Sequence, residues 1–137
     1  MKTRRMIICA VVALFLAGSA FAMNQDIQGS FGTDRVSQLM KKDVKDSNGK
    51  KIGSVSDIIF DQSGHASYVV IDHGGLLGIR NRLVPVPVSA FHKGNGDDLT
   101  LNIDKNRLEK APSFASRSWP NFQDHSYDQK VNAYYGQ

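Results

Sequence analysis

The 137-residue chain contains 17 basic and 13 acidic residues, a formal net charge of +4, and one cysteine, Cys9. Three basic residues and Cys9 fall within the first 22 residues, so the remaining 115 residues carry a charge of only +1 and no thiol. This composition fits one ordinary domain and argues against charge-driven nucleic-acid binding. It also excludes disulfides and cysteine-based metal sites from residues 23–137.

Residues 1–22 have the pattern of a signal peptide. Lys2, Arg4 and Arg5 precede the apolar run Met6–Leu16, and Ala20-Phe21-Ala22 has the small-x-small form of a signal-peptidase site. The apolar run is shorter than the ~20 residues that a membrane-spanning helix needs. We therefore expect cleavage after Ala22 and no stable membrane insertion of the mature chain. Export to the periplasm is the first expectation, and the extracellular space is the alternative.

The polar residues 23–38 show no sustained period and are expected to form a flexible lead. From Leu39 to Pro112, short strand patterns alternate with turn signals, of which Asn48-Gly49 is the strongest. Gly53 interrupts the alternation around it, as a bulge or a barrel corner would. The expected strands are 39–46, 51–61, 65–73, 82–91 and 99–103, followed by a short helix at 105–112 that Asp104 caps and Pro112 ends.

Five or six short strands with no long helix between them predict a mainly β fold, a small antiparallel barrel or sandwich. Pro85 and Pro87 lie two apart in one strand, so both missing N–H donors fall on the same edge. That edge is expected to be unpaired, and the barrel open along it. The predicted core consists of Ile52, Val55, Ile58, Val70, Val86 and Leu101.

An ordered series of weak motifs runs through the same region. It begins with Val44-x-Asp46-x-x-Gly49-x-x-Ile52-Gly53-x-Val55-x-Asp57 and continues through Asp61-x-x-Gly64, "YVVID", "GGLLGI", "VPVP" and "LEKAP". The series resembles the PRC-barrel domain, a β-barrel module of photosynthetic reaction-centre H subunits and of a ribosome-maturation factor. The resemblance covers residues 39–112 and implies the barrel fold. Neither of those functions is expected here, because this chain carries an export signal and lacks their membrane helix and RNA-processing companion domain.

The glycine-rich loop after the third expected strand is the first candidate for a functional site. Gly74-Gly75-x-x-Gly78 has neither of the usual phosphate-binding spacings, and a proline-rich strand rather than a helix follows it. We therefore interpret it as a wide turn between barrel strands. Its three aliphatic residues exceed what a turn needs and are expected to dock onto the barrel itself or onto another chain: Leu76, Leu77 and Ile79.

Catalytic and metal-binding patterns are weak. His65 and His73 lie too far apart along one strand to share a metal, and surface histidines are the expected alternative. No local Ser/His/Asp or paired-carboxylate pattern marks a nucleophile or an acid–base couple. We therefore expect no enzyme activity, no cofactor and no metal site.

The C-terminal residues 113–137 hold six of the twelve aromatic residues of the chain. Asp124 or Ser126 can cap a helix there, and Gly136 can end it. Tyr127, Val131, Tyr134 and Tyr135 follow helical spacing. This aromatic arm is expected either to cover an open edge of the barrel or to bind a partner, with Trp119 and the three tyrosines as candidate contact residues.

Together these patterns predict a non-catalytic exported module that acts through protein–protein contact or self-association, with a homodimer as one form. The alternative is a small-ligand or metal-binding periplasmic protein that uses the histidines and the barrel mouth.

Overall fold

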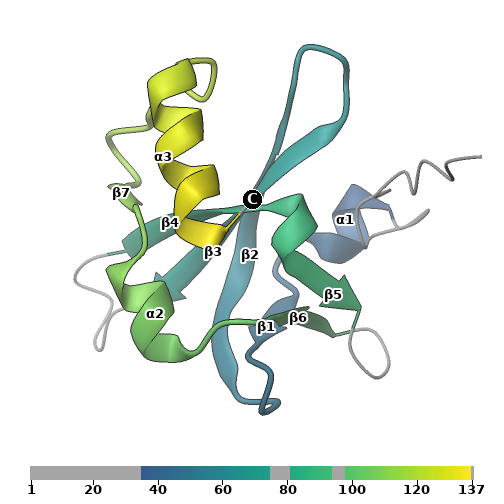
Figure 1. The fold of residues 1–137 in the computed structure, drawn as a ribbon. Helices are drawn as coiled ribbons and strands as arrows, with labels where there is room; N and C mark the ends of the chain where they lie inside the picture. Colours follow the sequence, from purple (N-terminus) through teal and green to yellow (C-terminus); the bar gives the residue numbers. More distant parts are fainter. Residues whose placement is uncertain (1–34, 75–80, 94–97, 137) are drawn as a thin grey trace, which may run out of the picture.

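The computed structural model describes residues 35–74, 81–93 and 98–136, and Figure 1 shows how their helices and strands are arranged. In chain order the elements are α1 (Val36–Leu39), β1 (Asp43–Lys45), β2 (Lys51–Phe60), β3 (Ala66–Gly74), β4 (Asn81–Pro87), the 3₁₀ turn η1 (Val88–Ala90), β5 (Phe91–Lys93), β6 (Leu99–Leu101), α2 (Lys105–Lys110), β7 (Phe114–Ala115) and α3 (His125–Tyr135).

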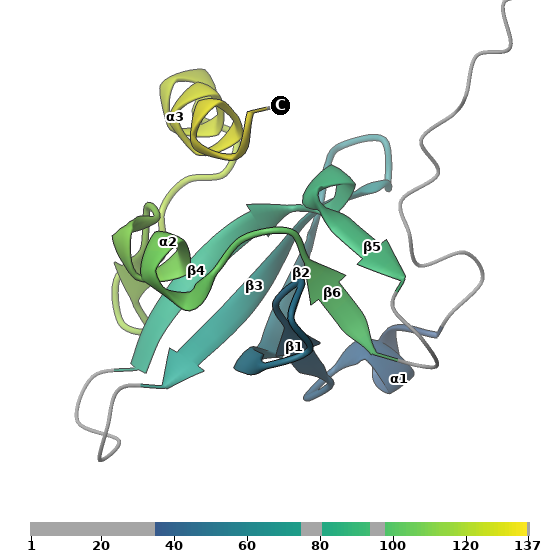
Figure 2. The ribbon, with the colours of Figure 1, turned by 60° about the horizontal axis from the view of Figure 1, so that its bottom comes forward.

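The seven strands form one sheet in the order β5-β6-β1-β2-β3-β4-β7. The sheet curls into a half-barrel, and after β6 the chain crosses to the side of β4 before it forms α2 (Figure 2). The predicted mainly β fold with a short helix and a C-terminal helix is confirmed. The sheet is mixed rather than wholly antiparallel, because β1 and β6 pair in parallel. A tight turn forces two strands to be antiparallel, but more than fifty residues separate β1 from β6, so no turn restricts their direction.

The start of the barrel differs from the sequence-based expectation. The short helix α1 covers the last three residues of the expected flexible lead and Leu39, and the strand expected at 39–46 is reduced to Asp43–Lys45. Leu39 is buried, and Lys41 has a positive φ of 65°. The Lys41 N–H donates to the Val55 carbonyl at 2.9 Å. Burial of Leu39 and this hydrogen bond fix a turn where the sequence alone favoured an extended strand.

Gly53 lies at the bulge that its sequence position predicted. The β1–β2 register pairs Val44 with Gly53 but Lys45 with Lys51, which leaves Ile52 as the extra residue. A Cβ atom at Gly53 would lie 2.4 Å from the Ile71 Cγ2 atom and 2.9 Å from the Asp72 carbonyl oxygen. Glycine is therefore required here by the close approach of β2 to β3.

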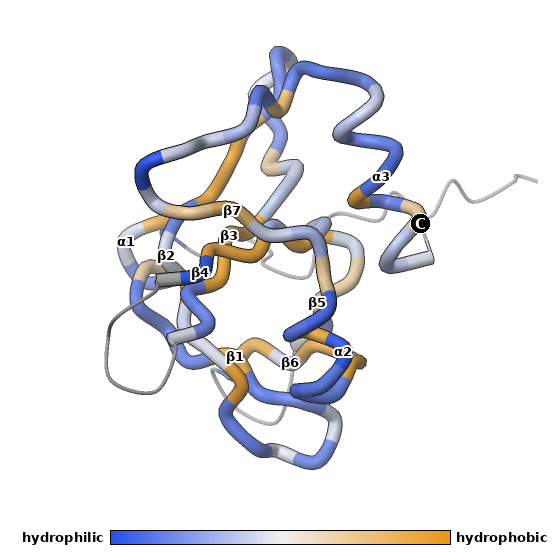
Figure 3. Tube along the Cα trace, turned by 90° about the vertical axis from the view of Figure 1, so that its left-hand side faces the viewer, coloured by the Kyte–Doolittle hydropathy of each residue, from blue (hydrophilic) through white to orange (hydrophobic). Residues whose placement is uncertain are grey.

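The main hydrophobic cluster fills the inside of the curled sheet. All six residues of the predicted core are buried, and five of them belong to this cluster. The exception is Val70, which is fully buried but does not belong to the cluster, although its neighbours on β3, Val69 and Ile71, do. Hydrophobic stretches follow the strands, whereas the turns and most of α3 are hydrophilic (Figure 3).

The edge of β4 that was predicted to be unpaired is open at the two prolines, but β7 pairs with its first part. β4 pairs with β3 along its whole length, with Pro85 opposite Val70 and Pro87 opposite Tyr68. On its other side, the described residues provide only β7, which pairs with Arg82 and Leu83. Because proline has no backbone N–H, Pro85 and Pro87 could not donate hydrogen bonds on this edge, and no described strand pairs with them there. Helix α3 lies beside β4 (Figures 1 and 2).

Candidate functional site

The C-terminal arm contains the expected helix, α3. The Asp124 side chain accepts a hydrogen bond from the Ser126 N–H at 2.9 Å, which identifies Asp124 as the N-cap. Gly136 ends the helix in the left-handed conformation, with a φ of 76°. Both ends of the helix are therefore set by local residues.

The apolar stripe of α3 packs against the barrel of the same chain. Val131 is fully buried, Tyr135 is buried, and Tyr127 and Tyr134 pack against the main cluster from its rim. Removing these side chains from water stabilises the docked arm, because each aromatic ring covers a large apolar area. The surface of α3 that faces solvent is consequently polar.

Polar contacts fix the position of α3 on the barrel. The Tyr68 hydroxyl on β3 donates to the Asp128 carboxylate and accepts from the Asn132 amide nitrogen at 3.2 Å. Because Asp128 and Asn132 are four residues apart, they lie on one face of the helix and can both reach this hydroxyl. Burial, with a smaller contribution from the hydrogen bond to Asp128, raises the pKa of Tyr68 well above its usual value of 10.0.

Helices α2 and α3 are joined by a reciprocal contact. The Arg107 guanidinium donates to the Tyr134 carbonyl at 3.1 Å and lies 5.8 Å from the centre of the Tyr134 ring. The Tyr134 hydroxyl donates back to the Arg107 carbonyl at 2.6 Å. Tyr134 therefore contributes to the attachment of the arm through its hydroxyl, its carbonyl and its ring.

Between β7 and α3, the arm builds a cluster of aromatic rings centred on Phe122. The ring of Phe122 lies 5.6 Å from Tyr68, 5.7 Å from Tyr127, 6.0 Å from Phe114 and 6.4 Å from Trp119, measured between ring centroids. These separations and tilted geometries are the ones that favour aromatic pairs. The cluster links the sheet to the outermost part of the arm.

Trp119 is the exposed end of this cluster. Its side chain is 45% exposed, while its ring contacts Phe114 with 4.8 Å between centroids. The indole N–H donates to the Ser116 carbonyl at 3.1 Å. The ring is therefore held in place by tilted packing against Phe114 and by a local hydrogen bond, and it presents an apolar surface to solvent.

The predicted contact residues fall into three groups. Leu76, Leu77 and Ile79 lie outside the described residues, so their docking stays a prediction. Tyr127, Tyr134 and Tyr135 turn toward the barrel, and Trp119 faces solvent.

The sequence patterns did not mark Phe60 or Val36, which are 51% and 45% exposed. Phe60 belongs to the apolar pattern of β2, but a register shift between Ile59 and Phe60 interrupts the alternation. A strand period read from the sequence cannot locate such a shift.

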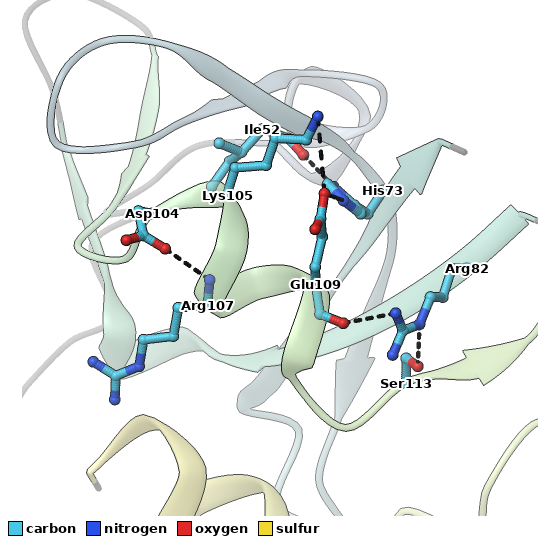
Figure 4. Close-up of polar contacts among 8 residues, drawn as sticks. All are labelled: Ile52, His73, Arg82, Asp104, Lys105, Arg107, Glu109 and Ser113. Atoms are coloured by element: carbon cyan, nitrogen blue, oxygen red, sulfur yellow. Dashed lines mark hydrogen bonds and ion pairs between the residues drawn. The ribbon is translucent and has the colours of Figure 1, made fainter. Parts of the chain in front are cut away.

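The histidines do not gather into a site. His65, His92 and His125 are exposed, and His73 is 11% exposed in its side chain. The His73 Nδ1 atom lies 2.7 Å from the Ile52 carbonyl oxygen, and its Nε2 atom lies 3.6 Å from the Glu109 carboxylate (Figure 4). Within the described residues, no group of three or more His, Cys, Asp or Glu side chains could hold a metal ion.

The contacts of His73 serve to attach α2. Arg82 donates to the Glu109 carbonyl and to the Ser113 hydroxyl, both at 2.6 Å, and Lys105 lies 3.8 Å from the Glu109 carboxylate (Figure 4). His73 and Arg82 thus join α2 to β3 and β4 through Glu109, and the contact of His73 with Ile52 joins β3 to β2. An open depression of about 350 Å³ lies beside them, between the ends of β2 and β3 and Lys105. Its lining includes Lys51, Asp72, His73 and Lys105, and one buried oxygen of the Asp72 carboxylate has no hydrogen-bond partner among the described residues.

Among the described residues, none of the helices has the length and apolar character needed to cross a bilayer. A search of curated proteins found no match to this chain. The family model of the PRC-barrel domain matches residues 31–108, more than half of the chain, including β1 to β6 and the first part of α2. The matched region begins at residue 31, whereas the sequence motifs predicted that the domain begins at residue 39. The aromatic arm lies outside the match. The chain therefore belongs to the PRC-barrel domain family.

Proposed function

We propose that this protein is a non-catalytic exported module that acts through protein–protein contact or self-association, and that Trp119 is the centre of the contact surface. The observation that supports this is the way Trp119 is held. An aromatic ring that is fixed before binding loses little conformational entropy when a partner covers it. Tryptophan is also among the residues most enriched at the energetic centres of protein interfaces.

The hydrogen bonding of Trp119 supports the same proposal. Because its N–H already donates to the Ser116 carbonyl, a partner can bury the ring without having to satisfy a polar group. The α3 stripe does not compete for this role, since its apolar residues are used against the barrel. The loop residues Leu76, Leu77 and Ile79 are a second proposed contact, and the export of the chain rests on the signal-peptide pattern of residues 1–22.

The test is crosslinking and affinity capture from intact periplasm, with the wild-type chain, Trp119→Ala and Phe60→Ala. Phe60 is a matched control, because it is also an exposed aromatic residue but lies on β2 rather than on the arm. Trp119→Ala should weaken capture or self-association by about 2 kcal/mol or more, a loss of roughly thirtyfold in affinity, while Phe60→Ala should have little effect. Melting curves of both variants check that the barrel remains folded.

Equal capture by Trp119→Ala and the wild type would contradict the proposed contact surface. Native mass spectrometry of the same preparations tests the alternative of a small-ligand or metal-binding protein. A stoichiometric bound metal or small molecule would instead favour a ligand-binding protein.

A further inference from the structure

Two β-hairpin turns of this chain have the same local geometry. One spans Asp46–Lys50 and the other spans Asp61–His65. In each, the aspartate N–H donates to the carbonyl of the fifth residue at 2.8 Å, and the glycine N–H donates to the aspartate carbonyl, at 2.9 Å for Gly49 and 3.1 Å for Gly64. The aspartate carboxylates accept from the N–H groups of the third and fifth residues, at 2.8–3.0 Å. Gly49 and Gly64 have φ values of 77° and 82°.

The turns differ chemically at the residue before the glycine. The first turn has Asn48, whereas the second has Ser63. Asn48 and Gly49 are both exposed, and a Cβ atom at Gly49 would meet nothing within 4 Å, so little of the chain covers this part of the turn. An asparagine followed by glycine is the sequence in which the backbone nitrogen can most readily reach the side-chain carbonyl, because glycine has no side chain to obstruct it.

We propose that Asn48 is a site of spontaneous deamidation. The Gly49 nitrogen gives its proton to solvent and forms a bond to the Asn48 Cγ atom. The bond from Cγ to the amide nitrogen then breaks, and ammonia leaves. Water opens the resulting five-membered imide at either carbonyl and produces aspartate or isoaspartate at position 48. The reaction consumes one water molecule, releases one ammonia molecule, and requires no oxidant, reductant or enzyme.

The turn itself controls the rate. The attacking Gly49 nitrogen is engaged with the Asp46 carbonyl, and the Asn48 N–H is engaged with the Asp46 carboxylate. Attack therefore requires local opening of the turn, an event that costs less than global unfolding at an exposed hairpin tip. Deamidation of Asn48 in the folded chain should consequently be about tenfold or more slower than in the urea-unfolded chain.

The product should not fit the turn. Isoaspartate carries the chain through its side-chain carbon and lengthens the backbone by one atom, so the four hydrogen bonds around Asp46 cannot all form. Either product also adds a carboxylate beside Asp46, which is only 4% exposed and whose carboxylate already accepts two N–H groups. Modification should therefore loosen the β1–β2 hairpin.

The experiment incubates the full chain in mildly alkaline buffer and maps tryptic peptides over time. Lys45 and Lys50 flank the turn, so the peptide Asp46–Lys50 separates this site from Asn95-Gly96, which lies outside the described residues. The expected result is that a growing fraction of this peptide shows the mass increase that replacement of the Asn48 amide by a carboxylate produces. Part of that fraction should be detected as isoaspartate by enzymatic methylation.

Two substitutions exchange the residues of the two turns. Asn48→Ser should abolish the change in the first peptide and keep the wild-type melting temperature, because the second turn shows that serine fits this geometry. Ser63→Asn should create a second site that reacts at a comparable rate. No modification of Asn48 in the folded chain, while the urea-unfolded chain reacts, would overturn the proposal, as would reaction at the same rate in both states.

Discussion

Removing the hydroxyl groups of Tyr68 and Tyr127 should change stability in opposite directions, although both changes are Tyr→Phe. The Tyr68 hydroxyl donates to the Asp128 carboxylate and accepts from Asn132. The Tyr127 hydroxyl is buried and has no hydrogen-bond partner among the described residues. The phenyl ring remains in both variants, so the contacts of each ring with Phe122 are retained.

The expected magnitudes follow from these environments. A hydrogen bond to a charged group contributes ~1.5–3 kcal/mol, so Tyr68→Phe should lower the free energy of unfolding by about this amount. A buried hydroxyl without a partner costs ~1–3 kcal/mol, so Tyr127→Phe should raise the free energy of unfolding by about 1 kcal/mol. The two variants should therefore differ by at least ~2.5 kcal/mol, or by about 10 °C in melting temperature for a domain of this size.

The assay is urea unfolding of the wild type and both variants. The slope of the free energy of unfolding against urea concentration should be the same for all three, so that the midpoints report stability. Equal destabilisation by the two substitutions would refute the reasoning, because it would mean that the Tyr127 hydroxyl has a partner.

A pH series supplies a second readout. Burial raises the pKa values of Tyr68 and Tyr127 above 10.0. These two tyrosines therefore ionise first in the unfolded chain, so their contribution to stability should be constant below about pH 10 and fall above it. Each Phe variant should reduce this alkaline loss.

Two further outcomes are expected. Gly53→Ala should destabilise the barrel by ~1–3 kcal/mol, because its Cβ atom would overlap Ile71 and the backbone of Asp72, whereas Gly74→Ala, where a Cβ atom would meet nothing within 4 Å, should be nearly neutral. Equal denaturation midpoints for the two would contradict the close approach of β2 and β3. Deletion of everything after Ser113 should lower the melting temperature strongly, since it removes β7 and the buried stripe of α3. If the truncated chain keeps its melting temperature but no longer associates with itself or a partner, the arm is needed only for partner binding and not for the stability of the barrel.

The amino-acid sequence by itself determined the features that depend on neighbouring residues. Asp104 and Asp124 cap helices because each can reach a backbone N–H two or three positions ahead. Gly49 and Gly64 mark the turns because glycine tolerates positive φ at little cost. The spacing of Pro85 and Pro87 predicted an unpaired edge, because residues two apart in a strand direct their donors to the same side.

The tertiary structure decided the features that depend on distant residues. The parallel pairing of β1 with β6 depends on where a long connection returns, and no local pattern encodes it. Strand period did not reveal that Phe60 faces solvent, because the register shift between Ile59 and Phe60 is set by the packing of β2 against β3. Helical spacing identified the stripe of α3 but could not say which surface it covers. Only the fold shows that Tyr127, Tyr134 and Tyr135 turn to their own barrel and that Trp119 stays exposed, because burial is a property of the assembled layers.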